Sequence, residues 1–333
     1  LGQLFTSVVG KIQMRIIGTF LLSGIISLSL SCTNSQERQE EVAEVTKTSL
    51  VVLGNVQDAG YPQIGCTKAC CVDQWGKTAE PKMVTSLGLV DGETRTTWLF
   101  DASPDFKYQT KLLSDYAGND SIVLPQGIFL THGHIGHYTG LMQLGREAIN
   151  AQEIPVYAMP RMGDFLRTSG PWSQLLKLNN IVIEGLSVDS AVQLTESLRV
   201  VPFLVPHRAE FTETVGYRIE GASKSALFIP DIDKWHLWER DIRAEIGKVD
   251  IAFLDATFYQ NGEVGNRDMS EIPHPFVEES MQLFDELSEQ EKRKVYFIHF
   301  NHTNPLLQEG SEARREVLAR GYNIAQEGFT FEL

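Results

Sequence analysis

Three histidines lie close together in the chain, and their type and spacing are typical of metal ligands. His132, His134 and His137 follow the apolar run 128–130, which predicts a short buried strand. Neutral imidazole is the commonest protein ligand for zinc-like ions, and a strand that ends at the cluster would hold the rings on a rigid edge. The alternative is three unrelated loop histidines, but the chain contains only eight histidines in all. The motif therefore predicts a metal site.

The elements that must position this motif are short apolar strands that alternate with helices. Helices are predicted from 106 through Tyr116, over 138–150 and over 159–178. Several strands end at a histidine or an aspartate, as at His207, Asp231, Asp255 and His299. Because strands alternating with helices favour a layered α/β domain, we expect one domain over residues 49–333. Its strands are predicted at residues 49–54, 84–90, 96–100, 128–130, 156–158, 198–205, 215–220, 226–229, 249–254 and 295–298.

The histidine motif resembles the His-x-His-x-Asp-His motif of the metallo-β-lactamase superfamily, and later positions match the same family in order. His207 corresponds to a lone histidine ligand, Asp231 to the aspartate that bridges two metals and acts in catalysis, and His299 to the final histidine. The resemblance implies an αββα sandwich with its ligands on loops at one edge of the two sheets. It also implies two metal positions, one formed by His132, His134 and His207 and the other by His137, Asp231 and His299.

Gly136 stands where the family motif has an aspartate, which is normally a ligand of the second metal. The second position would then have one carboxylate fewer and would be weak, empty, or completed by water or substrate. We therefore expect one or two divalent metals, zinc, manganese or iron, with a bias toward a single tightly bound ion. Metal coordination lowers the pKa of bound water toward neutrality, which suits attack on a phosphoryl or carbonyl centre.

A closer resemblance points to one branch of the superfamily. Residues 53–71 and the run from His299 to Pro305 resemble pyrroloquinoline quinone biosynthesis protein B and the cyclic-phosphate phosphodiesterase of phosphonate breakdown. They resemble the transfer-RNA 3′-processing nucleases more distantly. The resemblance implies a hydrolase acting on a small, cyclic phosphodiester or a related ester. Two alternatives stay open: an iron-dependent oxygenase, and a degenerate metal-binding protein that kept only the fold.

A cysteine cluster, Cys66, Cys70 and Cys71, lies in the loop after the first strand. A disulfide is the default expectation for a protein in an oxidising compartment such as the bacterial cell envelope, although three cysteines leave one unpaired. A structural zinc site needs a fourth ligand. The resemblance to the phosphodiesterase implies that His302 completes such a site. Here the order is Cys-x-x-x-Cys-Cys, whereas the relatives have Cys-x-Cys-x-x-Cys.

Five further residues are weaker candidates. His274, between two prolines, is expected to reach the cleft as a proton donor or substrate contact, with a solvated loop histidine as the equal alternative. Asp58 could line the site or form an Asx-turn, and Asp255 could orient a ligand histidine. His236 lies beside two tryptophans and favours a structural role. Arg208 favours a surface ion pair.

Composition restricts the class of partner. The 333 residues are 42% hydrophobic and 22% charged, which suits a globular protein with a full core, and the formal net charge is −14. Binding nucleic acid needs clustered Lys and Arg, so no nucleic-acid partner is expected. A small anionic substrate remains compatible with this charge because a metal can supply local positive charge.

The first residues resemble a bacterial lipoprotein signal. From Met14, the expected start, a basic residue is followed by an apolar run and then by small residues before Cys32. We expect a signal segment over residues 1–31 and a flexible tether over 32–48, with the protein held at the bacterial cell envelope by its lipid anchor only. The N-terminal peptide of the purified protein should carry a lipid mass on Cys32, and Cys32→Ala should release the protein from the membrane fraction. An unmodified peptide with unchanged fractionation would contradict this expectation.

Overall fold

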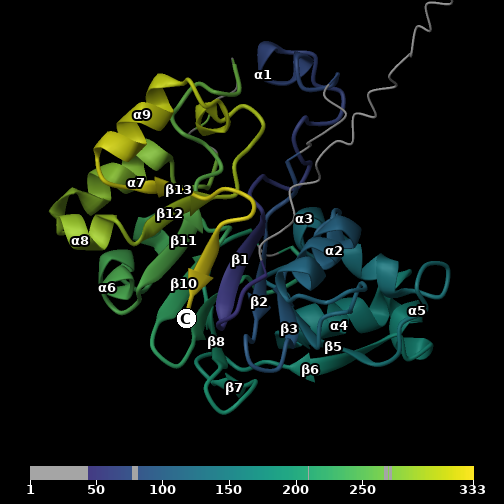
Figure 1. The fold of residues 1–333 in the computed structure, drawn as a ribbon. Helices are drawn as coiled ribbons and strands as arrows, with labels where there is room; N and C mark the ends of the chain where they lie inside the picture. The colour runs from purple at the N-terminus through teal and green to yellow at the C-terminus, as the bar shows by residue number, and fades with distance from the viewer. Residues whose placement is uncertain (1–43, 77–81, 209, 266–268, 270–271) are drawn as a thin grey trace, which may run out of the picture. The chain divides into compact units, whose positions relative to one another are not determined.

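Two seven-stranded sheets pack face to face in the computed structural model, and helices cover the outer face of each sheet (Figure 1). The structure describes residues 44–76, 82–208, 210–265, 269 and 272–333. The two sheets of seven strands are counted within these residues. They all lie in one compact unit. The predicted αββα sandwich of the metallo-β-lactamase type is confirmed. The expected signal segment, Cys32 and most of the tether lie outside the described residues.

The first sheet is mixed, with parallel pairing from β3 to β6. Its order is β14-β1-β2-β3-β4-β5-β6. The strands are β14 (Thr330–Glu332), β1 (Ser49–Gly54), β2 (Ser86–Val90), β3 (Thr97–Phe100), β4 (Gly127–Phe129), β5 (Ile154–Ala158) and β6 (Ile181–Gly185).

The second sheet has the order β13-β12-β11-β10-β9-β8-β7 and is parallel from β10 to β13. The strands are β13 (Asn323–Ile324), β12 (Val295–Ile298), β11 (Ile251–Asp255), β10 (Ser225–Ile229), β9 (Val215–Glu220), β8 (Arg199–Leu204) and β7 (Val192–Gln193).

Each outer face is covered by amphipathic helices. In α2, for example, Phe106 and Leu113 are buried against the first sheet together with Val51 and Leu99. On the first sheet lie α2 (Phe106–Tyr116), α3 (Ile135–Tyr138), the 3-10 helix η1 (Thr139–Leu144), α4 (Pro160–Thr168) and α5 (Trp172–Lys177). On the second lie α6 (Ile242–Gly247), α7 (Val277–Leu283), η4 (Phe284–Glu286), α8 (Glu289–Lys292) and α9 (Glu312–Ala319), while α1 (Ala69–Val72), η2 (Trp235–Leu237) and η5 (Pro305–Leu307) lie in loops.

Aromatic side chains fill the space between the sheets and fix the start of the histidine motif. Phe100 and Phe129 of the first sheet stack at 5.1 Å between ring centroids, and Tyr217 of the second sheet packs edge-on to both. The buried hydroxyl of Tyr217 donates a hydrogen bond of 2.5 Å to the carbonyl of Leu130. Leu130, two positions before His132, is therefore hydrogen-bonded to the second sheet.

Two predicted helices differ from the structure. Residues 138–150 form the end of α3 and the 3-10 helix η1 instead of one α-helix, because the Gly140 N–H donates to the Ala102 carbonyl and Gly145 is extended. Residues 159–178 form two helices, α4 and α5. Helix α4 ends before Pro171, which has no backbone N–H to continue the helical hydrogen bonds. The short strands β6, β7, β13 and β14 were not predicted.

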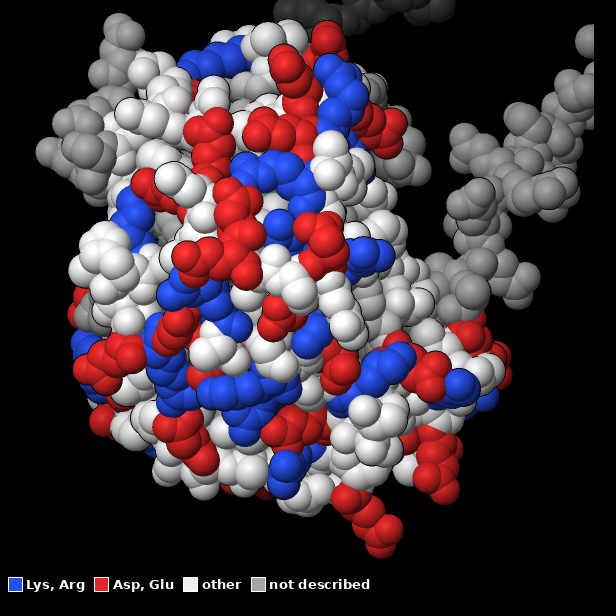
Figure 2. Space-filling view, turned by 90° about the vertical axis from the view of Figure 1, so that its left-hand side faces the viewer, with Lys and Arg blue, Asp and Glu red and all other residues white. Residues whose placement is uncertain are grey.

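Charged side chains of both signs are interspersed on the face of the molecule shown in Figure 2. Basic residues commonly pair with acids, as Arg243 does with Glu286 at 2.6 Å and Arg240 with Asp189 at 2.7 Å. Among the helices described in the structure, none has the length and apolar character needed to cross a membrane.

Candidate metal centre

The predicted site residues meet at one edge of the sandwich because their strands end there. Parallel strands carry their carboxyl ends to the same edge of a sheet, and the strands that lead to Asp101, His132, Asp231 and His299 are parallel within their sheets. The side chains described at this edge form three clusters of histidines and aspartates, and Asp231 belongs to two of them.

The first cluster contains His132, His134, His207 and Asp231, whose facing atoms all lie within 4.8 Å of one another. The His207 Nε2 atom is 3.3 Å from His134 Nδ1. Asp231 Oδ2 is 3.3 Å from His132 Nε2 and 3.2 Å from His207 Nε2. A tetrahedral zinc ion with ligands at about 2.1 Å requires ligand atoms roughly 3.4 Å apart. These donors therefore fit a single divalent ion.

The second cluster contains Asp58, His137 and His299. The Nε2 atoms of His137 and His299 are buried and form no hydrogen bond within the part of the chain that the structure describes. Asp58 Oδ1 lies 3.4 Å from His137 Nε2, and Asp231 Oδ2 lies 4.0 Å from the same nitrogen. Buried polar atoms rarely lack a partner, so this arrangement also fits a bound cation.

Asp231 connects the first cluster to a third one, formed with Asp255 and His274. His274 Nδ1 lies 2.9 Å from Asp255 Oδ2 and 3.1 Å from Asp231 Oδ1. The His274 side chain is only 10% exposed. Because the two carboxylates occupy Nδ1, Nε2 is the nitrogen available for other chemistry. Of the two alternatives that the sequence left open, the structure places His274 against Asp231 and not in a solvated loop.

Two residues of the first sheet fix the rings of His132 and His137. The hydroxyl of Thr131 donates to the Asp101 carboxylate at 2.9 Å, so its oxygen accepts from His132 Nδ1 at 3.0 Å. His137 Nδ1 donates to Asp101 Oδ2 at 2.7 Å. Both rings are therefore oriented with Nε2 toward the site. Such supporting hydrogen bonds set the tautomer and orientation of metal-ligating histidines.

The same arrangement recurs in the second sheet. The Thr257 hydroxyl donates to Asp255 Oδ1 at 2.7 Å and its oxygen accepts from His299 Nδ1 at 3.0 Å. His207 Nδ1 donates to Asp233 Oδ1 at 2.9 Å. Asp255 therefore orients a candidate ligand through Thr257 instead of contacting it directly.

His134 presents Nδ1 to the site, whereas His132 and His137 present Nε2. Its Nε2 donates to Glu210 Oε2 at 3.2 Å, and its Nδ1 faces His132 Nε2 at 2.9 Å. In these tautomers neither facing nitrogen carries a proton. Two lone pairs at that distance repel each other unless a cation lies between them, which again supports a metal position.

The electrostatic field of the site favours positive charge beside His137. Burial by itself lowers the pKa of His137, but Asp101 and then Asp58 outweigh burial and raise this pKa well above its usual value. Burial lowers the pKa values of His132 and His299, which therefore stay neutral. Burial raises the pKa of Asp231, but the charges of His207 and His274 prevail and hold it well below its usual value. The site thus combines neutral imidazoles at His132 and His299 with an ionised carboxylate at Asp231 and a field that stabilises positive charge on His137.

Two residues at strand ends adopt a left-handed backbone conformation that few residues other than glycine tolerate. The φ angles are 65° at Asp101 and 69° at His299. Such conformations cost of order 1–3 kcal/mol each and cluster at functional sites. Here they turn the chain abruptly after β3 and β12, which directs both side chains to the edge of the sandwich.

The three cysteines lie together with His302, and the four facing atoms are within 4.8 Å of one another. All three thiols are free, and the Cys66 and Cys70 sulfurs are 3.7 Å apart. With zinc–sulfur bonds of about 2.3 Å, a tetrahedral zinc ion places sulfurs roughly 3.8 Å apart. His302 Nδ1 is buried and has no hydrogen-bond partner in the described structure. This cluster fits a closed zinc site.

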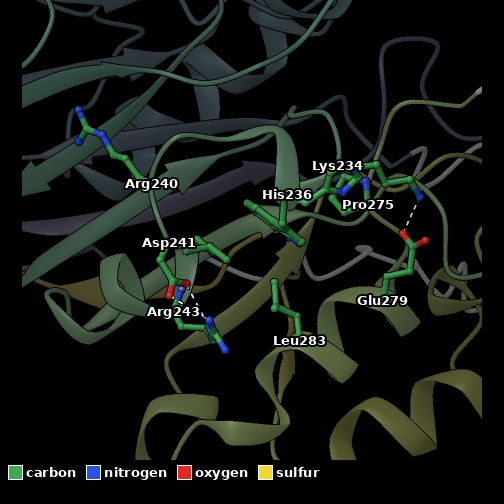
Figure 3. A pocket seen from close by; sticks show the side chains of 10 residues that line it. Lys234, His236, Arg240, Asp241, Arg243, Pro275, Glu279 and Leu283 are labelled. Atoms are coloured by element: carbon green, nitrogen blue, oxygen red, sulfur yellow. Dashed lines mark hydrogen bonds and ion pairs between the residues drawn. The ribbon is translucent and has the colours of Figure 1, made fainter.

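His236 and Arg208 lie apart from these clusters, and both side chains are exposed. His236 lines a cavity of about 610 Å³ together with Lys234, Arg243 and Pro275 (Figure 3). The Lys234 ammonium group pairs with Glu279 at 2.5 Å, and the Arg243 guanidinium group pairs with Asp241 at 3.0 Å. None of the described metal-cluster residues lines this cavity.

A second cavity, of about 520 Å³, is lined by His207 and by Pro206, Thr214 and Arg240. Small-molecule sites commonly have volumes of about 300–1,000 Å³. Since this cavity opens beside a residue of the first cluster, it is the better candidate for a substrate cleft, although it is the smaller of the two.

Sequence reasoning missed the residues that support the histidines. It gave no role to Asp101, Asp233, Thr131, Thr257 or Glu210. The sequence did offer a signal for the two threonines. Thr131 directly precedes His132, and Thr257 lies two residues after Asp255. Glu210 lies in a loop with no such signal, since only folding brings it to the site. Asp58 was a candidate, and of its two alternatives the structure shows that it faces the site.

Comparisons with known proteins agree with this architecture. The family described as the beta-lactamase superfamily domain matches residues 96–300. Coenzyme PQQ synthesis protein B of Methylobacterium sp. (strain 4-46) is 27% identical over 305 residues, which cover 85% of this chain and 99% of that protein. The protein of the same name from Methylorubrum extorquens (strain PA1) is 27% identical over 312 residues, with the same coverage of 85% and 99%.

Solved structures share the fold. The crystal structure of Zn(2+)-bound PqqB from Methylobacterium extorquens has a TM-score of 0.72 at 23% identity and covers 86% of this chain and 100% of that chain. A diphosphatase from the PhnP family has a TM-score of 0.57 at 24% identity and covers 86% of this chain and 97% of its own.

Proposed function

The chain belongs to the beta-lactamase superfamily domain family, as its sequence predicted, and we propose on this premise that it is a metal-dependent hydrolase. We propose a small phosphodiester, cyclic or open, or a related ester as the substrate. The observation that carries the proposal is the position of the Asp231 carboxylate, whose oxygens face His132 and His207 on one side and His274 on the other.

The residues present fit divalent metal ions. His132, His134, His207 and Asp231 would hold one ion, and His137, His299 and Asp231 would contribute to a second. The ions would supply Lewis acidity and an activated water molecule. Cys66, Cys70, Cys71 and His302 would hold a structural zinc ion that takes no part in the reaction. Clusters of nitrogen and carboxylate donors also suit manganese or iron.

His274 is the proposed proton donor. Hydrolysis forms a bond between phosphorus and the oxygen of water and breaks the bond to one ester oxygen, which leaves as an alkoxide that needs a proton. His274 is held by Asp255 and Asp231 through Nδ1, and its ring centroid lies 5.4 Å from that of His207, which lines the 520 Å³ cavity. It is therefore positioned beside the first metal cluster, where it would protonate the leaving group of a bound ester.

A small substrate suits the charge of the protein better than nucleic acid does. The net charge of −14 repels an extended polyanion, whereas a single phosphodiester needs only local neutralisation by the metal ions. The crystal structure of a diphosphatase with this fold supports hydrolysis at a phosphoryl centre. The proposed location at the cell envelope rests on the sequence of the first residues.

The second candidate is an iron-dependent oxygenase resembling the quinone biosynthesis proteins. The observation that favours it is the sequence similarity to coenzyme PQQ synthesis protein B along 85% of this chain. Histidine and carboxylate ligands also suit iron. The two candidates differ in the native metal and in their need for oxygen.

A metal analysis combined with a substrate panel tests the proposal. We expect purified protein to contain zinc or manganese and to hydrolyse bis(p-nitrophenyl) phosphate or a 2′,3′-cyclic nucleotide. The chelator EDTA should abolish turnover, and added zinc or manganese should restore it, because the activated water requires the ion. Iron in the protein, with oxygen consumption and no hydrolysis of phosphodiesters or lactones, would favour the oxygenase instead.

A further inference from the structure

Asp58 occupies the space that the motif's aspartate side chain would need. A Cβ atom added at Gly136 would lie 2.0 Å from Asp58 Oδ1 and 2.7 Å from Asp58 Cα. Both distances are far below van der Waals contact. The glycine at position 136 therefore makes room for Asp58, both for its carboxylate and for its backbone Cα atom.

The Asp58 carboxylate faces the second cluster. Its Oδ1 atom accepts a hydrogen bond from the Gly136 N–H at 3.1 Å and lies 3.4 Å from His137 Nε2. The ligand atoms of Asp58, His137 and His299 lie within 4.8 Å of one another. The side chain is 18% exposed. The Asp58 carboxylate is therefore close enough to His137 and His299 to serve as a third ligand of a cation bound between them.

The backbone ties Asp58 to the strand end that carries His299. The Gln57 N–H donates to the Phe300 carbonyl at 2.9 Å, and the Phe300 N–H donates to the Asn55 carbonyl at 2.9 Å. The side-chain amide of Asn301 also donates to Gln57 Oε1 at 3.2 Å. The loop after β1 is thus held in register with the residues that follow β12, so the distance from Asp58 to His299 is set by the fold.

We propose that Asp58 is the carboxylate ligand of the second divalent-cation position, which it completes together with His137, His299 and Asp231. It replaces the aspartate that the family motif places at position 136. The proposal rests on the proposed metal-dependent function, and it revises the expectation that Gly136 leaves this position one carboxylate short. That expectation counted only residues within the motif.

The competing role for Asp58 is purely structural, as an acceptor for the Gly136 N–H. Asp58→Asn separates the two roles, because an asparagine keeps the size of the side chain and an acceptor oxygen but loses the charge. Loss of a merely supporting hydrogen bond lowers metal affinity by about 10–100-fold. Loss of a ligand at the second position should instead remove detectable binding there.

Manganese binding provides a readout that is independent of turnover. The full-length protein is dialysed against EDTA and titrated with MnCl₂, and the bound manganese is followed by EPR, with the zinc content recorded alongside. We expect the unmodified protein to bind about two manganese ions with the spectrum of a coupled pair, as in other two-metal sites. Asp58→Asn should bind about one, with the spectrum of an isolated ion. Asp73→Asn, which removes an exposed carboxylate from the same loop, is the matched control and should resemble the unmodified protein.

Removing the carboxylate altogether is the second arm. Asp58→Gly should lose the second manganese ion, as Asp58→Asn does. Gly136→Asp alone should not increase occupancy, because the new side chain meets both the carboxylate and the Cα atom of Asp58. Thermal unfolding of each variant shows whether it folds, and Asp58→Asn, which keeps the size of the side chain, decides the question if Asp58→Gly does not fold.

The outcomes separate this inference from the proposed function. An unmodified protein that binds no manganese at the histidine clusters would overturn both. Two bound ions in the unmodified protein and two in Asp58→Asn would overturn the role of Asp58 alone, and so would two bound ions in a folded Asp58→Gly variant.

Discussion

Replacing Asp231 with asparagine is expected to lower turnover by at least about 10³-fold, because a bound metal ion contributes several kcal/mol to catalysis and about 4 kcal/mol corresponds to 10³-fold. Asp231 Oδ2 lies within 4.0 Å of the facing nitrogens of His132, His207 and His137. One substitution therefore weakens both metal positions. The measurement is kcat/KM on the best phosphodiester of the panel, with metal content determined on the same sample.

His274→Gln is the comparison for this variant. It removes the proposed proton donor, for which losses of about 10²–10⁴-fold are typical, and should leave the metal content unchanged. The loss should also shrink for an ester whose leaving group needs no protonation. If Asp231→Asn kept both its metal ions and its turnover, the central role of that carboxylate would be wrong.

The second large effect is expected at His302. His302→Ala should lower the zinc content by about one equivalent, because a structural zinc site needs all four ligands. It should also destabilise the fold, since zinc binding at such a site contributes to folding free energy. A loss on the order of 3 kcal/mol would lower Tm by roughly 6 °C in a chain of this size. Elemental analysis and thermal unfolding measure both quantities.

Two variants sharpen this experiment. His302→Cys supplies a different zinc ligand and should restore both zinc content and Tm. His236→Ala removes an exposed histidine outside the metal clusters and should change neither. Unchanged zinc and Tm in His302→Ala, or a disulfide between two of the three cysteines in a non-reducing peptide digest, would contradict the zinc site.

The cysteine cluster and Asp58 belong to the same loop, which links the structural zinc site to the second metal position. The loop runs from the end of β1 through Asp58 to Cys71, and His302 follows His299 by three residues. Zinc at the cluster would fasten the far end of the loop to the segment after β12, while the hydrogen bonds of Gln57 and Phe300 fasten its near end. The structural metal site would therefore help to hold a ligand of the catalytic one.

The sequence alone determined the family, the sandwich and the residues that stand at strand ends. A short apolar run followed by a histidine or aspartate is a local pattern, and parallel strands bring their ends to one edge whatever the details of packing. His132, His207, Asp231 and His299 are of this kind, and His134 and His137 follow His132 in the motif that resembles the family's. Their convergence could thus be predicted without coordinates.

Only the tertiary structure decided which additional groups reach that edge. Asp58 lies 78 positions before Gly136, in a loop with no periodic pattern, and its place depends on hydrogen bonds to the segment after β12. The proton positions on the histidines likewise depend on Asp101, which accepts from His137, and on Asp255, which acts on His299 through Thr257. The contacts of the Asp58 loop with the segment after β12 join one sheet to the other, and no local spacing encodes them.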